Sequence, residues 1–352
     1  MRALVLAGGE GSRLRPITHT QAKQLIPIAN RPILFCALEA IRDAGITEVG
    51  IIVGSTAEEV RAAVGDGARW GVSVTYIPQT APLGLAHAVL TAEDFVRGEP
   101  FLMYLGDNVL LEGLAGFVQE FDRHRPDAQI FLARVREPER FGVAVLDGDR
   151  VTRLVEKPAQ HISDLALVGV YLFDDSILQA AKAIRPSGRG ELEITDAIQQ
   201  LIDTGKTVRA SMVSGWWKDT GKPEDLLEAN RIMLEVQQPD VAGTVDDAST
   251  LEGNVIVAAG AKVHRSTLRG PVVIGEGSVV EGSVLGPNTS VGDACRISGS
   301  HVEDSIVLQG CSIRDVRGLT GSILGKGVEV VHTGGTGMHR LIVGDQSRVE
   351  VD

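Results

Sequence analysis

The sequence predicts an α/β domain built on a doubly wound, mostly parallel sheet, followed by a parallel β-helix. Two observations predict this division. Up to about residue 236, strand-like apolar runs alternate with amphipathic helical stretches, which is typical of βαβ units. Beyond residue 243, apolar residues return with a short period and glycines fill the gaps, which indicates stacked coils. We therefore expect a first domain over residues 1–238 and a second over residues 244–352.

The first domain opens with a buried strand at residues 4–6, whose continuous apolar character is typical of a parallel sheet. Further strands are predicted at residues 48–54, 72–77, 100–107, 128–135 and 167–174. Helices are predicted at residues 32–44, 57–65, 84–95, 113–124, 175–184, 191–204 and 223–236. The dipeptide Asp147-Gly148 between two alternating runs predicts a β-hairpin beside the sheet. In such sheets ligands bind outside the carboxyl ends of the strands.

The second domain repeats every 17 residues, in apolar steps of six, six and five. The positions on this register are Leu251, Leu268, Leu285, Val302 and Leu319. A glycine near each corner of such a repeat indicates the coils of a parallel β-helix. A resemblance to hexapeptide-repeat proteins implies that the β-helix is left-handed. The terminal RLIVGDQSRVEV predicts a capping edge or a last partial coil.

Composition excludes several classes of function. The formal net charge of −12 argues against a nucleic-acid surface. The sequence has no apolar run of the length of a membrane span and no signal-peptide pattern at its start. The three cysteines lack the spacing of metal ligands and suit a reducing cytoplasm. An anionic substrate would therefore need a local positive pocket within a negative field.

A glycine-rich loop follows the first strand in the sequence LVLAGGEGSRLRP, residues 4–16. Its glycines allow close backbone approach to a ligand, its N–H groups can bind an anion, and Arg13 and Arg15 add charge. The loop matches neither the Walker A motif nor the dinucleotide-binding fingerprint. A tight strand-to-helix connection is the alternative interpretation. Lys23, on a second polar loop, favours binding of a polyphosphate.

Two aspartates follow apolar strands in the first domain. Asp107 comes directly after FLMYLG, and Asp219 lies in GWWKDTG after a second strand. Mg²⁺ on a nucleotide needs only one or two protein carboxylates, since phosphate and water supply its other ligands. The alternatives are a turn role for Asp107 and a helix cap for Asp219. Their shared position at strand ends favours a metal site.

Further polar residues fit a sugar phosphate and a base. Glu156 and Lys157 precede a proline, so that a carboxylate and an amine could bind a sugar hydroxyl and a phosphate. Arg189 precedes a helix start, which attracts anions. Gln79 offers a donor and an acceptor to a base edge, and Gly84 permits close approach. A solvated strand end and flexible loops are the alternatives for these residues.

Taken in order, these segments resemble the sugar-1-phosphate nucleotidylyltransferases, and most closely the long-form members that act on dTTP and glucose 1-phosphate. The segments that carry the resemblance are LAGGEGSRLRP, Lys23, PQTAPLGLA, LGDN, ERFGV, EKP, GELEITD and WKDTG. The resemblance covers about residues 1–236 and implies a Rossmann-like catalytic domain. It also implies a Mg²⁺-dependent reaction that yields dTDP-glucose and pyrophosphate.

The resemblance implies a role for each matching residue. Arg13 and Lys23 would be catalytic, gripping the triphosphate. Mg²⁺ would bind Asp107 and Asp219. The nucleotide would contact Leu6, Gly8, Gly9, Gly11, Ser12, Gln79, Gly84 and Asp107. The sugar phosphate would contact Gly142, Glu156, Lys157, Leu167, Arg189 and Trp217. Phe141 stands where the commoner pattern has a tyrosine, so its polar role is in doubt, and Lys218 has no assigned role.

Three alternatives remain open from the sequence. Gln79 can pair with uracil as well as thymine, so the nucleotide could be UTP. The β-helix could carry an acyltransferase activity with His264 or His301 as the base, although an assembly surface for a homo-oligomer is the simpler expectation. A third interpretation is a regulatory sugar-nucleotide-binding scaffold without catalysis, against which the complete set of carboxylates and cations argues.

Overall fold

The computed structural model describes residues 1–334 and 337–352, and its chain divides into two compact units. The first unit consists of Met1–Glu10 and Ile33–Asp219, and the second of Gly11–Pro32 and Thr220–Asp352. The second unit therefore contains the β-helix together with a segment from near the N-terminus. Each unit is described by itself below.

The first unit is built on a nine-stranded sheet with the order β5-β4-β1-β6-β11-β8-β12-β10-β9. In that order the strands are Ser73–Pro78, Glu48–Val53, Arg2–Ala7, Phe101–Leu105, Leu165–Phe173, Ala128–Arg134, Val208–Met212, Arg150–Glu156 and Gly142–Asp147. Strands β7 (Asn108–Leu110) and β13 (Trp217–Asp219) form a separate two-stranded ladder. The strands expected from the sequence are all present, and β9 and β10 form the predicted hairpin across Asp147-Gly148.

The sheet is parallel from β5 to β6 and again between β8 and β12. Strand β11, however, runs antiparallel to both β6 and β8. The chain enters β11 from the hairpin through residues 157–164, without the crossover helix that a parallel neighbour requires. The hairpin meets β11 near the start of that strand, where Ala166 pairs with Val143 of β9.

The helices lie close to the predicted ranges. They are α1 (Ile33–Asp43), α2 (Ala57–Val64), α3 (Leu85–Thr91), α4 (Glu93–Val96), α5 (Ala115–His124), α6 (Ser176–Ala183), α7 (Ile194–Asp203) and α8 (Pro223–Val236). The helix expected over residues 84–95 is interrupted at Ala92, which separates α3 from α4. The described residues also form five short 3-10 helices: Ser12–Leu14, Ile17–His19, Lys23–Leu25, Ala68–Trp70 and Pro138–Arg140.

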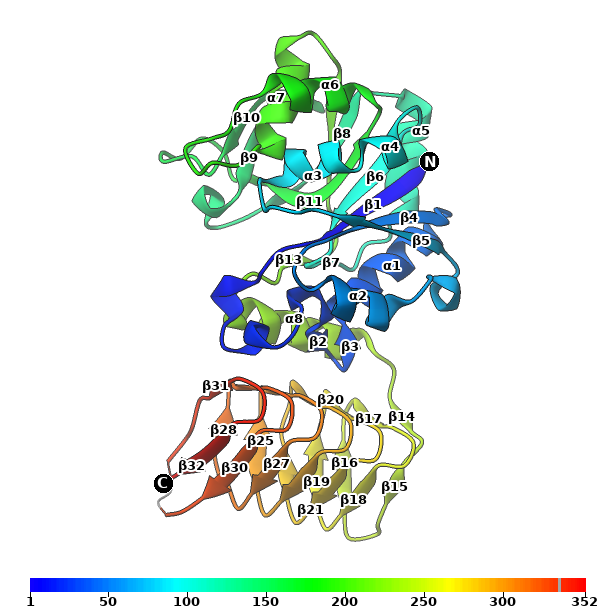
Figure 1. The fold of residues 1–352 in the computed structure, drawn as a ribbon. Helices are drawn as coiled ribbons and strands as arrows, with labels where there is room; N and C mark the ends of the chain where they lie inside the picture. The colour runs from blue at the N-terminus through cyan, green and yellow to red at the C-terminus, as the bar shows by residue number, and fades with distance from the viewer. Residues whose placement is uncertain (335–336) are drawn as a thin grey trace. The chain divides into compact units, whose positions relative to one another are not determined.

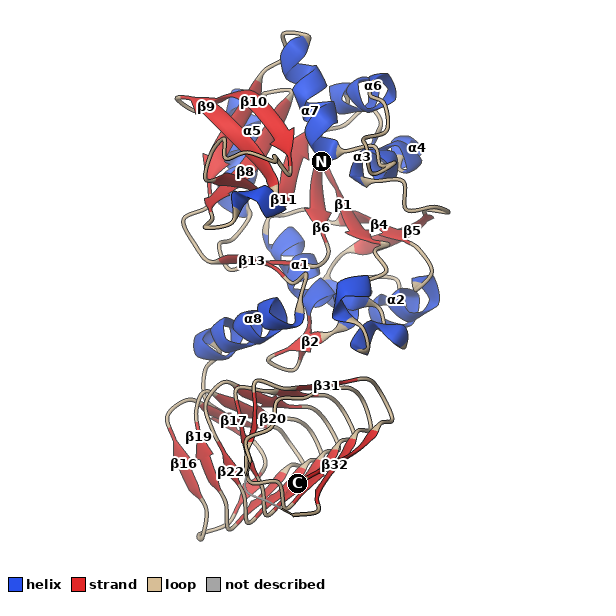
Figure 2. Cartoon of the chain, turned by 90° about the vertical axis from the view of Figure 1, so that its left-hand side faces the viewer, coloured by secondary structure: helices blue, strands red, loops and turns tan. Residues whose placement is uncertain are grey.

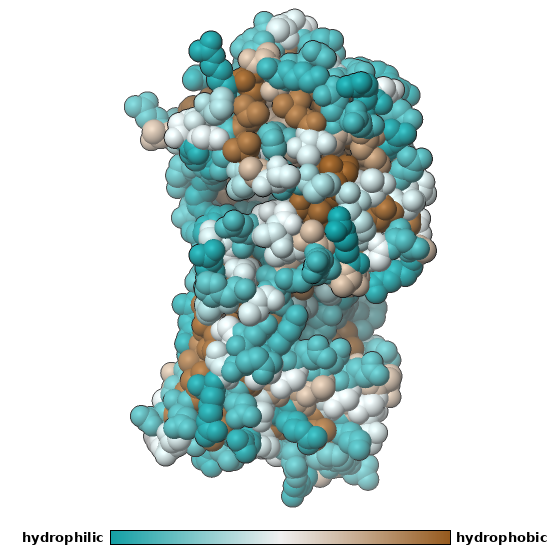
Figure 3. Space-filling model, viewed as in Figure 1, coloured by the Kyte–Doolittle hydropathy of each residue, from teal (hydrophilic) through white to brown (hydrophobic). Residues whose placement is uncertain are grey.

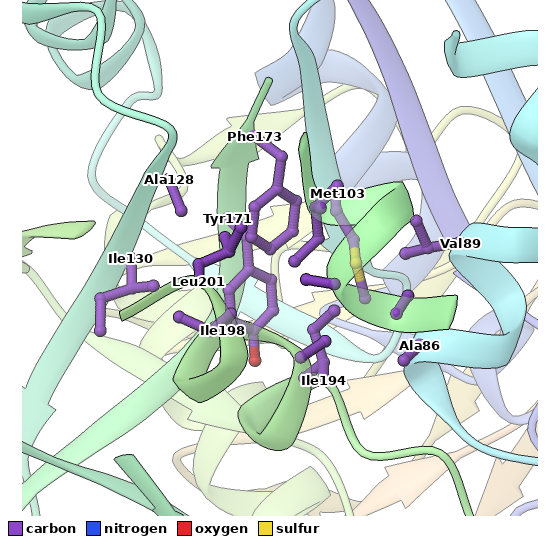
Figure 4. Close-up of a cluster of buried hydrophobic side chains, with 14 of the residues drawn as sticks. Ala86, Val89, Met103, Ala128, Ile130, Tyr171, Phe173, Ile194, Ile198 and Leu201 are labelled. Carbon is purple, nitrogen blue, oxygen red and sulfur yellow. The ribbon is translucent and has the colours of Figure 1, made fainter. Parts of the chain in front are cut away.

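The apolar core of the first unit joins the sheet to α3, α6 and α7. Figure 4 shows Tyr171 and Phe173 of β11 between Met103 of β6 and residues of α7. Their rings stack at a centroid distance of 5.6 Å. Because α7 packs on this core, its first turn is held at a fixed place above the sheet.

The second unit contains a left-handed β-helix of three parallel sheets (Figure 2). The β14 sheet comprises Asp240–Val241, Val255–Val257, Val272–Ile274, Thr289–Val291, Ile306–Val307, Ile323–Leu324 and Ile342–Val343. The β15 sheet comprises Thr244–Val245, Lys262–His264, Val279–Glu281, Arg296–Ser298, Ser312–Arg314, Glu329–His332 and Arg348–Val351. The β16 sheet comprises Thr250–Glu252, Thr267–Arg269, Val284–Leu285, His301–Glu303 and Leu319–Thr320.

The strand register confirms the 17-residue repeat. Leu251, Leu268, Leu285, Val302 and Leu319 pair in succession from coil to coil along the β16 sheet. The inward residues form one apolar core along the β-helix. The last strands, β31 (Ile342–Val343) and β32 (Arg348–Val351), continue their sheets, so the terminal segment adds a partial coil.

Polar residues cover most of the face seen in Figure 3, and apolar residues appear there only in small groups. Among the described residues, no helix combines the length and the apolar character needed to cross a membrane. Figure 1 traces the chain from the sheet strands near the N-terminus to the coils near the C-terminus.

We expect Leu285→Ala to destabilise the β-helix by about 2–5 kcal/mol, because it removes a fully buried side chain from the stacked core. The free energy of unfolding from denaturant titration measures this loss. Thr250→Ala, at an exposed position of the same sheet, is the matched control. Equal effects of the two substitutions would contradict the stacked-core account.

Candidate active site

The carboxyl end of β1 opens the site in the first unit. Leu6 pairs in parallel with Leu105 of β6, and its carbonyl accepts a hydrogen bond from the Gly106 amide at 3.0 Å. The glycine loop therefore starts beside the turn that carries Asp107. A side chain at Gly8 would lie 3.6 Å from Oε1 of Gln79, so Gly8 keeps the space beside Gln79 open.

Hydrogen bonds fix the orientation of the Gln79 carboxamide. Its Nε2 lies 2.9 Å from Nδ1 of His87 and donates to the Gly84 carbonyl at 3.4 Å. With Nε2 donating, Nδ1 of His87 is the acceptor, and the proton of a neutral ring is on Nε2. The Oε1 atom of Gln79 is consequently the group that faces the space at Gly8.

A backbone connection ties the Gln79–Gly84 loop to the segment that carries Arg189. The Leu192 amide donates to the Leu83 carbonyl at 2.7 Å, and the Ala86 amide donates to the Leu192 carbonyl at 3.0 Å. Gly84 has a φ of +106° and lies so close to Leu192 that a Cβ would collide with its backbone. Only glycine fits this position. The two loops are therefore held as one piece.

The two predicted metal ligands come from neighbouring strands of a small ladder. Asp219 of β13 pairs with Asn108 of β7, the residue that follows Asp107. Two carboxylates at one strand end match the protein ligands of a Mg²⁺ that takes its other ligands from phosphates and water. Among residues 1–334 and 337–352, no group of three or more His, Cys, Asp or Glu side chains could hold a metal ion.

A second cluster surrounds Gly142 at the start of β9. Gly142 pairs with Glu156 of β10, and a Cβ at Gly142 would lie 3.2 Å from Oε2 of Glu156 and 2.8 Å from Cδ1 of Leu167. It would also lie 2.5 Å from the methyl group of Thr195, whose hydroxyl donates to Oε2 of Glu156 at 3.2 Å. The structure thereby brings three predicted sugar-site residues together around one carboxylate.

Two cations flank Glu156. Nζ of Lys157 lies 3.1 Å and Nη2 of Arg189 lies 3.2 Å from the same oxygen, Oε1. Arg189 also donates to both oxygens of the buried Glu193 at 2.9 Å. Burial alone would lower the pKa of Arg189, but the bond to Glu193 and the charges of nearby carboxylates hold that pKa above its usual value. The guanidinium is therefore a permanent cation beside the Glu156 carboxylate.

Trp217 of β13 belongs to the same region. Its Nε1 donates to Oδ1 of Asn108 at 2.7 Å, and its ring meets that of Phe141 edge-on at 5.5 Å. Nδ2 of Asn108 in turn donates to Oδ1 of Asp107 at 3.0 Å. Phe141, which precedes Gly142, therefore contributes a ring contact rather than a polar group. Lys218 pairs with Val109 in the ladder.

Gly11, Ser12, Arg13 and Lys23 belong to the second unit. Gly11 has a φ of +63°, and a Cβ there would lie 3.0 Å from Cβ of Lys23, so these residues are close. The Gly11 carbonyl accepts from the Thr18 hydroxyl at 2.7 Å. Arg13 is exposed, whereas Lys23 is only 6% exposed. Gly9 lies between Gly8 and Gly11 in the glycine-rich loop.

Several site residues were not identified from the sequence. Asn108, His87, Glu193 and Thr195 orient the predicted residues without standing out as a motif. Asn108 adjoins Asp107 in LGDN, and the other three stand near or within segments that were singled out. Asn108 and Thr195 contact residues from distant parts of the chain, whereas His87 and Glu193 contact residues within eight positions of themselves. The two histidines considered as bases in the β-helix lie beside carboxylates, His264 at 3.5 Å from Asp246 and His301 at 3.8 Å from Glu303.

Comparison with known proteins identifies the class. A family model described as nucleotidyl transferase matches residues 2–236, and the chain belongs to that family. A glucose-1-phosphate thymidylyltransferase from Streptomyces griseus is 54% identical over 353 residues, which cover 100% of this chain and 99% of the relative. Low-salt glycan biosynthesis nucleotidyltransferase Agl11 from Haloferax volcanii is 46% identical over 357 residues and is matched over 100% of both chains.

A solved structure also matches the first part of the chain. It comes from Bacillus anthracis, is assigned to the glucose-1-phosphate thymidylyltransferases and contains sucrose. Its TM-score is 0.64 at 35% sequence identity, and the match covers 68% of this chain and 98% of that chain. The resemblance inferred from the sequence motifs is thus confirmed at the level of the family.

The carboxylates near Glu156 predict a pH-dependent effect of one substitution on the melting temperature. Burial, then the charges of Glu193 and Glu156, raises the pKa of Asp196 in the first turn of α7. A raised pKa means that the ionised carboxylate destabilises the fold at neutral pH, and that this cost vanishes below the unfolded-state pKa. We therefore expect Asp196→Asn to raise the melting temperature more at pH 7 than at pH 4.

Differential scanning calorimetry at the two pH values measures this difference. Asp122→Asn, at an exposed carboxylate of α5, is the control. A melting temperature that falls with Asp196→Asn at pH 7 would contradict the prediction, because the charge would then stabilise the start of α7 more than burial opposes it.

Proposed function

We propose that this chain is a glucose-1-phosphate thymidylyltransferase, which converts dTTP and glucose 1-phosphate into dTDP-glucose and pyrophosphate. The observation that supports this most directly is Glu156, whose carboxylate has Lys157 and Arg189 on one oxygen and the Thr195 hydroxyl on the other. A carboxylate that accepts from sugar hydroxyls, next to two cations for a phosphate, suits a sugar phosphate. Leu167 and Trp217 supply apolar contact to the sugar.

The orientation of Gln79 supports a thymine or uracil base. Its Oε1 faces the space beside Gly8, because Nε2 is directed to His87 and the Gly84 carbonyl. An acceptor at that place pairs with the N3–H donor of thymine or uracil. It would face the ring-nitrogen acceptor on the corresponding edge of cytosine or adenine. The acceptor therefore disfavours cytosine and adenine, and among the pyrimidine nucleotides UTP is the competitor of dTTP.

The proposed chemistry is a single in-line displacement. A phosphate oxygen of glucose 1-phosphate attacks the α-phosphorus of dTTP, and the bond from that phosphorus to the bridging oxygen of the β-phosphate breaks as pyrophosphate leaves. Arg13 and Lys23 bind the triphosphate and neutralise the departing charge. Asp107 and Asp219 would hold Mg²⁺, which supplies further charge neutralisation at the phosphates when bound. The substrates provide the nucleophile, so the protein aligns two anions and needs no covalent intermediate.

In this proposal residues 1–238 carry the nucleotidyl transfer, and the β-helix of residues 244–352 serves structure and assembly into a homo-oligomer. Gly9, Gly11 and Ser12 complete the nucleotide loop. Acyl transfer by the β-helix is the competing activity from a different class. The experiment below includes both activities.

The experiment combines each of dTTP, UTP, CTP and ATP with glucose 1-phosphate or another hexose 1-phosphate and identifies the products by mass. A separate reaction with acetyl-CoA and an amino-sugar phosphate tests acyl transfer. We expect dTDP-glucose as the main product, with UDP-glucose as the next. Failure to form any sugar nucleotide from dTTP or UTP, with the purified full-length chain and Mg²⁺, would contradict the proposal.

We expect Asp107→Asn to retain the fold and to lower kcat by about 10²-fold or more, by analogy with the loss of one electrostatic stabiliser. Turnover at saturating Mg²⁺ and both substrates measures this effect. Asp122→Asn removes one exposed carboxylate elsewhere on the first unit and should leave kcat unchanged. Near-normal turnover of Asp107→Asn would rule out its role as a metal ligand.

We expect Glu156→Ala to weaken the binding of glucose 1-phosphate by about 1.5–3 kcal/mol, which is the range for a hydrogen bond to a charged group. The Michaelis constant for glucose 1-phosphate at saturating dTTP reports this loss. Asp164→Ala, an exposed carboxylate paired with His161, is the matched control. An unchanged constant in Glu156→Ala would place the sugar elsewhere.

A further inference from the structure

The segment Gly11–Pro32 carries both proposed triphosphate cations, Arg13 and Lys23, yet it clusters with α8 and the β-helix in the second unit. It consists of three short 3-10 helices and the two-residue strands β2 (Pro27–Ile28) and β3 (Arg31–Pro32). Such short pieces have few internal hydrogen bonds. The conformation of the segment therefore depends on the surface that it contacts.

That surface is the outer face of the β14 sheet. Outward residues of a β-helix strand normally face water, as Lys262 and Arg296 of the β15 sheet do. On the β14 sheet the middle of the outward row is instead buried, namely Val273, Ser290, Ile306 and Ile323, whereas Ile256 and Ile342 at its ends are half-buried. Helix α8 contacts both β23 (Thr289–Val291) and β2, and Figures 1 and 2 both draw α8 and β2 next to this sheet.

One buried side chain joins all three elements. Asn230 of α8 is 0% exposed. Its Oδ1 accepts from the Ala29 amide at 2.8 Å and from the Ser290 hydroxyl, while its Nδ2 donates to the Asn288 carbonyl at 3.0 Å. Ala29 has a φ of +47°, a left-handed conformation that a residue with a side chain adopts only when its surroundings impose it. Asn230 supplies that constraint.

Further bonds extend the connection along the β-helix. Nδ2 of Asn30 donates to the Val291 carbonyl at 2.7 Å, and the Thr20 hydroxyl donates to Oδ2 of Asp345 at 2.7 Å. At Gly344 a Cβ would lie 3.1 Å from the Pro16 carbonyl oxygen, so the last coil approaches the segment closely. The contacts thus reach the segment from near Pro16 to Asn30, on both sides of Lys23.

We propose that Asn230 is a positioning residue for the triphosphate, because it fastens the segment Gly11–Pro32, which carries Arg13 and Lys23, to the β14 sheet of the β-helix. This inference rests on the proposed roles of Arg13 and Lys23. An assembly or stability role for the β-helix alone would affect both substrates alike. The positioning role instead predicts a selective loss of dTTP binding.

The test compares Asn230→Ala and Asn30→Ala with Asn254→Ala in the full-length protein. Asn254 donates to the Leu234 and Gln237 carbonyls, so it joins the end of α8 to the β-helix, and both of these bonds lie outside the segment Gly11–Pro32. Calorimetry measures the Kd for dTTP, and steady-state kinetics measures the Michaelis constant for glucose 1-phosphate at saturating dTTP. Hydrogen exchange measures the opening of residues 11–32.

For Asn230→Ala we expect the Kd for dTTP to rise about fivefold to tenfold, which corresponds to the loss of one to two buried hydrogen bonds. We also expect faster hydrogen exchange in residues 11–32. Asn30→Ala should show the same pattern more weakly, and it carries the test if Asn230→Ala fails to fold. The Michaelis constant for glucose 1-phosphate should stay within about twofold. Asn254→Ala should match the wild type in all three readouts.

The inference is overturned if both variants bind dTTP like the wild type, if residues 11–32 exchange at the wild-type rate, or if Asn254→Ala has the same effect. Equal weakening of both substrates would overturn it as well. Absence of dTTP binding by the wild type is a separate result: it would refute the proposed function, and the positioning role with it, before any variant is compared.

Discussion

The backbone connection at Leu192 is the constraint on which the active-site region of the first unit depends. It joins the loop that carries Gln79 and Gly84 to the segment that carries Arg189 and leads into α7. Because α7 is packed on the core around Tyr171, both loops inherit the rigidity of that core. A proposed base contact and a proposed phosphate contact are thereby fixed relative to each other before a substrate arrives, which lowers the entropy cost of aligning two substrates.

Electrostatics reinforce this preorganisation. The chain has a net charge of −12, so phosphate binding depends on local cations rather than on the field of the whole protein. Arg189 is held by Glu156 and Glu193. A sugar phosphate that engages Arg189 therefore competes with carboxylates already in place. In the proposed function, Glu193 would keep hold of the guanidinium while Glu156 accepts from sugar hydroxyls.

Local patterns in the sequence were sufficient for the features that repeat or that follow a strand. The leucine register of the β-helix and the hairpin at Asp147-Gly148 are of this kind. The ladder that pairs Asp219 with Asn108 was not predicted. The antiparallel direction of β11 was not predicted, because it depends on how a hairpin returns to the sheet rather than on strand composition. Asn230 was also missed, since an asparagine within an amphipathic helix reveals nothing about a partner sixty residues further along the chain.

The most direct measurement is a crystal structure of the full-length protein with dTDP-glucose and Mg²⁺. The account predicts that the sugar hydroxyls contact Glu156, that the phosphate nearest the sugar contacts Lys157 and Arg189, and that N3–H of thymine donates to Oε1 of Gln79. A sugar bound away from Gly142 and Glu156, or a thymine that leaves Gln79 bonded only to His87, would contradict it.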